Sequence, residues 1–129
     1  MIPSPPVTPL AANAQATFHP QIIHEVARAV ELHDVVLVGM SINFPVKQAR
    51  QNLDEAQVRY HYIEYGGYLS MWRERLALKL WTGWPTYPQI FVRGTFIGGG
   101  SELRQMIRDG SLKEMLAGHR HDTSSSRKP

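Results

Sequence analysis

Residues 84–103 read WPTYPQIFVRGTFIGGGSEL, and this stretch decides the fold. Its two prolines exclude a helix at the start, because proline lacks an amide proton and fixes φ. The apolar run Gln89–Val92 predicts a short strand, and Arg93-Gly94 predicts a tight turn into a second strand over Thr95–Ile97. Ser101, after three glycines, predicts the N-cap of an amphipathic helix. The stretch therefore predicts a β-hairpin followed directly by a helix.

Two features of this stretch also suggest a binding surface. The free backbone amides at the start of the helix, behind the glycine run 98–100, suit a carboxylate or a phosphate. The Tyr87-Pro88 bond at the entrance to the first strand is a candidate cis peptide, which usually marks a shaped surface.

Before this stretch, the chain alternates between helical and strand patterns. Apolar residues at helical spacing predict a helix over Pro20–Leu32, and the continuous run Val35–Val38 predicts a central strand covered on both faces. Pro45 is suited to begin a second helix. Residues 58–63 then predict a strand nearer the edge of the sheet.

A third helix is predicted over Leu69–Trp81, ended by Gly83. We expect its inner face to carry Met71 or Trp72, Leu76 and Leu80, and its outer face to carry Arg73, Arg75 and Lys79. After the hairpin, a fourth helix is expected over residues 101–108 and a last short one over residues 112–117.

The predicted order is therefore α-β-α-β-α-β-β-α. Strands joined by a crossover helix are parallel, with a right-handed crossover, and the tight hairpin must be antiparallel. The sequence thus predicts an α/β fold with a mixed four-stranded sheet flanked by helices. We expect a disordered proline-rich N-terminal extension over residues 1–18, one domain over 19–117 and a flexible polar tail over 118–129.

Composition limits the classes of function. The formal charge of the 129 residues is +3, and part of the excess lies in the tail, so a nucleic-acid partner is not expected. No apolar run reaches membrane-spanning length, and the N-terminus lacks the pattern of a secretory signal. We therefore expect a cytoplasmic protein that does not interact with membranes.

The cysteine count is zero, and it is the most informative number in the composition. No disulfide, cysteine nucleophile, zinc–thiolate site or cysteine-ligated iron–sulfur cluster can come from this chain. No histidine cluster recurs at the spacing of metal ligands, so we expect no metal site.

The opening stretch resembles the C-terminal half of a glutaredoxin. The run Trp84-Pro85-Thr86-Tyr87-Pro88-Gln89, followed by Phe96-Ile97-Gly98-Gly99, is similar to the CGFS-type monothiol branch of that family. The resemblance covers roughly residues 20–117. It implies a thioredoxin fold in which the Thr-x-Pro turn and the Gly-Gly loop form a glutathione groove.

The same resemblance locates the family's reactive site on residues 43–46. Asn43 falls on the nucleophilic cysteine, Val46 on the resolving cysteine or serine, and Met40 on a glutathione-binding lysine. An asparagine amide cannot form a thiolate, a mixed disulfide or an iron–thiolate bond. Ser41 and Ser101 are poor substitutes, because a serine nucleophile needs an adjacent base. We expect no catalytic residue, no iron–sulfur cluster and, without a cluster to bridge two copies, a monomer.

The binding half of the family's site is better preserved. The resemblance implies that the groove is formed by two basic positions, the Thr-x-Pro turn and the glycine loop, which are here Arg75, Lys79, Thr86, Tyr87, Pro88, Gly99, Gly100 and Ser101. The family usually has Asp where Ser101 stands, which weakens the match for the γ-glutamyl amine. A structural reading is open beside this one: Pro88 can serve the fold, the glycines can serve helix packing, and the two basic residues can be solvated charges.

Three functions follow from these observations. The first is a binding module, lacking thiol redox activity, whose groove holds glutathione or an extended segment of an unidentified partner protein. The second is a structural or interaction domain with a relic groove. The third is a glutathione-dependent oxidoreductase, which the similarity alone implies and the absence of cysteine argues against. We expect the first of these and no enzymatic activity.

Overall fold

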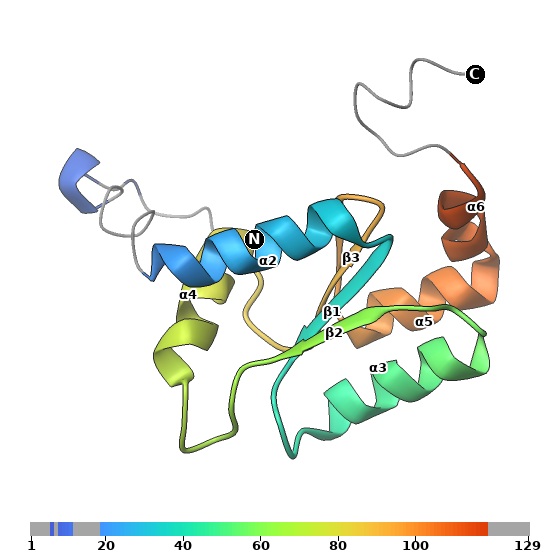
Figure 1. Ribbon diagram of the computed structural model, residues 1–129, viewed down its shortest axis with the longest axis horizontal. Coiled ribbons are helices and arrows are strands. Elements are labelled where there is room, and N and C mark those ends of the chain that lie inside the picture. The colour runs from blue at the N-terminus through green and yellow to red at the C-terminus, as the bar shows by residue number, and fades with distance from the viewer. Residues whose placement is uncertain (1–5, 7, 12–18, 119–129) are drawn as a thin grey trace.

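Figure 1 shows a computed structural model of the protein. The structure describes residues 6, 8–11 and 19–118. Most of the predicted N-terminal extension and nearly all of the predicted tail lie outside these residues; within the extension, residues 9–11 form a helical turn. None of the described helices is both long and apolar enough to cross a membrane.

The predicted order of elements is confirmed. The helices are α2 (Pro20–Leu32), α3 (Phe44–Glu55), α4 (Trp72–Thr82), α5 (Gly100–Asp109) and α6 (Ser111–Ala117). The strands are β1 (Val35–Gly39), β2 (His61–Glu64), β3 (Gln89–Val92) and β4 (Thr95–Gly98).

The strands form one mixed sheet in the order β2-β1-β3-β4. β1 and β2 are parallel, whereas β3 is antiparallel to both β1 and β4. In the hairpin turn both Arg93 (φ 51°) and Gly94 (φ 86°) lie in the left-handed region, as the twist of a two-residue turn requires. The α/β fold with a mixed four-stranded sheet is as predicted.

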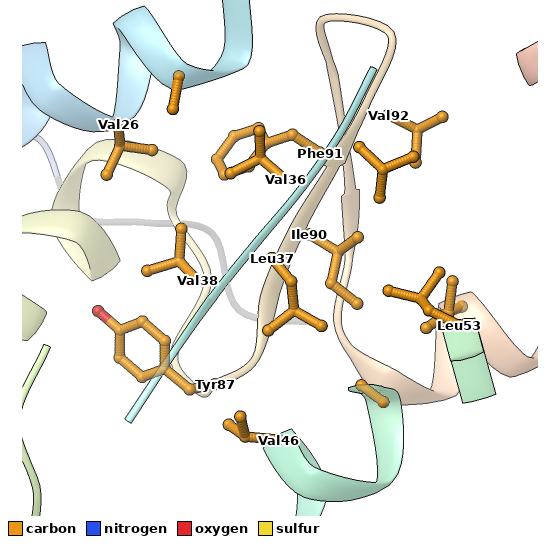
Figure 2. Close-up of a cluster of buried hydrophobic side chains, with 14 of the residues drawn as sticks. Val26, Val36, Leu37, Val38, Val46, Leu53, Tyr87, Ile90, Phe91 and Val92 are labelled. Carbon is orange, nitrogen blue, oxygen red and sulfur yellow. The ribbon is translucent and has the colours of Figure 1, made fainter. Parts of the chain in front are cut away.

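Helices cover both faces of the sheet (Figure 1). α2 packs beside α4, and α3 packs beside α5. β1 is buried along its whole length, and its side chains alternate between the two faces. Figure 2 shows Val36 and Phe91 on the side of α2, and Leu37 and Ile90 on the side of α3. The core is therefore two apolar layers, one on each side of the central strands.

β2 begins at His61, three residues later than the predicted strand. α3 ends at Glu55, its C-terminal cap extends to Val58, and residues 59–60 connect the cap to β2. Gln57 adopts a left-handed conformation (φ 60°), and the amide of Val58 donates to the carbonyl of Leu53 at 3.0 Å. This pattern satisfies a carbonyl left free at the helix end, so Val58 belongs to the helix cap.

Arg73 of α4 is exposed, as predicted, but the predicted inner face of the helix and the predicted outward position of Arg75 are wrong. Arg75, expected outside, is only 7% exposed, whereas Leu76 and Leu80, expected inside, are 37% and 44% exposed. The guanidinium of Arg75 donates to the carbonyl oxygens of Tyr65 at 2.8 Å and Ser70 at 2.6 Å. These bonds compensate for the burial of the charge, so the helix packs with its arginine inward.

Candidate binding groove

A groove of about 640 Å³ lies beyond the C-terminal end of β1. Four parts of the chain form it: the segment from Met40 to Gln48, one side chain of α4, the loop that precedes β3, and the segment from Gly99 to Arg104. Its lining residues are Met40, Asn43, Phe44, Pro45, Gln48, Lys79, Trp84, Pro85, Thr86, Tyr87, Pro88, Gly99, Gly100, Ser101, Glu102 and Arg104.

Seven of the eight predicted groove residues therefore lie around one groove. These are Lys79, Thr86, Tyr87, Pro88, Gly99, Gly100 and Ser101. Arg75 is the exception, because its guanidinium is engaged by backbone carbonyls on the buried side of α4. Met40 and Asn43, which fall on family binding and catalytic positions, also line the groove, whereas Val46 does not.

Asn43 has a structural role at the start of α3. Its side-chain oxygen accepts a hydrogen bond from the amide of Val46 at 3.0 Å, which makes it the N-cap of the helix. Val46 itself is buried and packs tightly against Gly39. A methyl group added to Gly39 would lie 2.6 Å from Cγ1 of Val46. At the two positions that carry redox chemistry in the family, this chain therefore has a helix cap and a core residue.

The loop over residues 84–88 is shaped from within by Gln89. This side chain is fully buried. Its amide nitrogen donates to the carbonyls of Trp84 (3.1 Å) and Thr86 (3.4 Å), and its oxygen lies 3.0 Å from the hydroxyl of Thr82. The sequence predicts Gln89 as a strand residue and as part of the family-like run 84–89, but no local signal shows that its partners are loop carbonyls. Gln89 fixes the position of the groove wall.

Tyr87 and Pro88 are joined by a cis peptide bond, as the sequence suggested. Tyr87 is buried, and its hydroxyl donates to the backbone carbonyl of Arg75 at 2.5 Å. Burial raises the pKa of the Tyr87 phenol well above its ordinary value, because the phenolate would be desolvated, although the charge of Arg75 opposes this shift. Tyr87 is therefore a neutral hydrogen-bond donor that ties the loop to α4.

The start of α5 forms the opposite wall. The prediction that Ser101 caps this helix is wrong: the N-cap is Gly99, and the carboxylate of Glu102 accepts from the Gly99 amide at 2.9 Å. A methyl group on Gly99 would lie 3.2 Å from both the Pro88 carbonyl and the Trp84 indole nitrogen. Glycine at this position thus allows the two walls to approach closely.

The charged groups around the groove are predominantly basic. Lys79 and Arg104 line it, and the single acidic lining residue, Glu102, is engaged with the helix start. The first amides of an α-helix have no intrahelical acceptor, and they carry the positive end of the helix dipole. The groove therefore suits an anionic ligand. Among residues 6, 8–11 and 19–118, no group of three histidine or acidic side chains is placed to hold a metal ion.

Comparison with known proteins agrees with this architecture. A family model described as Glutaredoxin matches residues 47–97. A glutaredoxin-like protein of Dictyostelium discoideum is 43% identical over 101 residues, which cover 78% of this chain and 82% of that protein. The chain belongs to the glutaredoxin family.

The monothiol branch is also among its relatives. Monothiol glutaredoxin-4 of Schizosaccharomyces pombe is 38% identical over 61 residues, which are 46% of this chain and 25% of that longer protein. Among solved structures, the buckwheat glutaredoxin–glutathione complex superposes with a TM-score of 0.66 at 25% identity. The match covers 76% of this chain and 89% of that glutaredoxin. The thioredoxin fold of the glutaredoxins is thereby established for this chain.

Proposed function

We propose that this protein is a glutaredoxin that binds glutathione, or an extended peptide of similar shape, without carrying out thiol redox chemistry. The observation that supports this proposal is the contrast between the two halves of the site. The groove walls are present and carry the cations Lys79 and Arg104, whereas the position of the nucleophilic cysteine holds Asn43, which caps α3. With no cysteine in the chain, disulfide exchange has no attacking thiolate.

The groove offers suitable partners for the backbone and the two carboxylates of glutathione. The backbone of Tyr87, next to the cis proline, can pair with the tripeptide as an added strand does. Lys79 supplies a cation for the glycine carboxylate. The amides at the start of α5, assisted by Arg104, suit the γ-glutamyl carboxylate. The similar buckwheat protein was solved as a glutathione complex, which supports the choice of this ligand.

The test is a titration of isotope-labelled protein with reduced glutathione, followed by NMR. We expect shifts clustered at Lys79, Tyr87 and Ser101. Lys79→Gln should raise the Kd roughly tenfold, the equivalent of one charge-assisted hydrogen bond. Lys113→Gln removes the same charge from the exposed face of α6 and should leave the Kd unchanged.

Two results would refute the proposal. Absence of shifts at millimolar glutathione would favour an interaction domain with a relic groove. Turnover of the wild-type protein in a glutathione-dependent disulfide reduction assay would show that redox chemistry persists without a cysteine.

A further inference from the structure

Exposed apolar side chains gather on and before α4. Seven of the eleven large apolar side chains that are exposed in the described part of the chain fall between residues 68 and 81. Within the helix, Trp72, Leu76 and Leu80 are 55%, 37% and 44% exposed. Their spacing of four residues places them in one row along the helix. We call Trp72, Leu76 and Leu80 the α4 stripe.

Among the described residues, the three side chains of the stripe belong neither to the core cluster nor to the partly buried side chains packed against it. The opposite side of α4 is already buried through Arg75, Ala77 and Leu78, and this face fixes the helix on the sheet. Polar residues in the stripe would leave these contacts intact. A contiguous apolar surface of this kind on a small domain usually marks an interaction site.

The borders of the α4 stripe are basic. Arg73 and Lys79 lie three residues before and three residues after Leu76, so they flank it on opposite sides. The guanidinium of Arg73 lies 5.0 Å from the centre of the Trp72 ring, and the ammonium of Lys79 lies 5.7 Å from the centre of the Tyr87 ring. Glu74, the one acidic residue of α4, is two positions from Leu76 and so faces away from the stripe.

We propose that the α4 stripe is the docking site of an amphipathic helix of a partner protein, whose apolar face is bordered by acidic side chains. A row of side chains at i, i+4 and i+8 packs between the rows of a facing helix. The cations on both borders then lie opposite carboxylates. Trp72, Leu76 and Leu80 lie outside the groove lining, whereas the border residue Lys79 belongs to it. The proposal does not depend on glutathione binding, because the apolar row and Arg73 are separate from the groove.

The charges disfavour two other occupants. A second copy of the chain, meeting the first stripe to stripe, would bring Arg73 and Lys79 of each copy against the same cations of the other. Helices that bind lipid surfaces carry a polar face rich in lysine and arginine opposite the apolar one, whereas that face of α4 is buried in this domain. An amphipathic protein helix with acidic borders is the occupant whose charges complement Arg73 and Lys79.

The test uses two synthetic amphipathic helices with the same leucine face, one with glutamate borders and one with lysine borders. Each is titrated into the labelled full chain. We expect the glutamate helix to shift the NMR signals of Trp72, Leu76 and Leu80. It should bind at least roughly tenfold more tightly than the helix with lysine borders. Leu76→Gln and Leu80→Gln, tested separately, should each weaken binding about tenfold. Arg73→Glu leaves one carboxylate and one cation on the borders, so it should remove most of the preference between the two helices.

The matched control is Leu32→Gln, at an exposed leucine of α2, which should change nothing. Equal binding of both helices, or shifts located in the groove, would overturn the proposal. The proposal would also be overturned if the protein formed a dimer in sedimentation, or bound phosphatidylglycerol vesicles, and Leu76→Gln abolished that dimer or that binding. If the glutamate helix bound only after residues 1–18 were removed, that segment of the chain would be the occupant of the stripe instead.

Discussion

Asn43→Cys is expected to give this protein a reactive thiol that forms a mixed disulfide with glutathione. The new thiol would lie at the N-cap of α3, beside the groove. A helix N-terminus lowers a cysteine pKa from about 8.5 toward about 7, which raises the thiolate fraction at neutral pH roughly tenfold. Intact-protein mass spectrometry after incubation with glutathione disulfide would follow the adduct, which wild type cannot form because it has no cysteine.

The control for this experiment is Gln51→Cys, an exposed position within α3 and away from its start. Its thiol should keep an ordinary pKa and react at least about tenfold more slowly at pH 7. The rate for Asn43→Cys should rise with pH through the lowered pKa and then level off, because only the thiolate attacks. Equal rates for the two variants would show that residue 43 is not positioned as the family's nucleophile is. Loss of the asparagine cap costs about 1 kcal/mol, which a folded domain tolerates.

The hairpin and the helix order were predictable because their signals are local. Arg93-Gly94 between two apolar runs specifies a turn without reference to the rest of the chain. The continuous apolar run of β1 likewise shows a strand buried on both faces. The family resemblance supplied what local signals could not, namely that Lys79 of α4, Tyr87 of the following loop and Gly99 at the start of α5 surround one groove.

The failures came from contacts that no local pattern encodes. Apolar residues occur on several sides of α4, so periodicity could not select its buried face, and only the carbonyls of Tyr65 and Ser70 explain why Arg75 lies inside. Ser101 is a good N-cap by type, yet the carboxylate of Glu102 reaches back to Gly99 and moves the helix start. The role of Gln89 depends on loop carbonyls brought near by the fold.

Arg75→Ala is expected to destabilise the domain by about 3 kcal/mol while leaving the affinity for glutathione unchanged. Removing the guanidinium leaves the carbonyls of Tyr65 and Ser70 without their donor, and an unsatisfied buried polar group costs about 1–3 kcal/mol. Urea denaturation should show a lower midpoint with the same slope. Arg73→Ala is the matched control, since its guanidinium is exposed and lies over the ring of Trp72, and it should cost less than about 1 kcal/mol.

The two roles conceivable for Arg75 predict opposite pairs of results. If Arg75 held the glycine carboxylate, as the family resemblance implies, its substitution would weaken glutathione binding without shifting the urea midpoint. If Arg75 instead supports the chain before α4, its substitution would lower the urea midpoint and leave the Kd of the folded protein unchanged. In Arg75 a single nitrogen, Nη1, donates to both carbonyls. Arg75→Lys retains a charge and donors on a shorter side chain, so it should fall between wild type and alanine in stability. A raised Kd with an unchanged midpoint would return Arg75 to the binding groove.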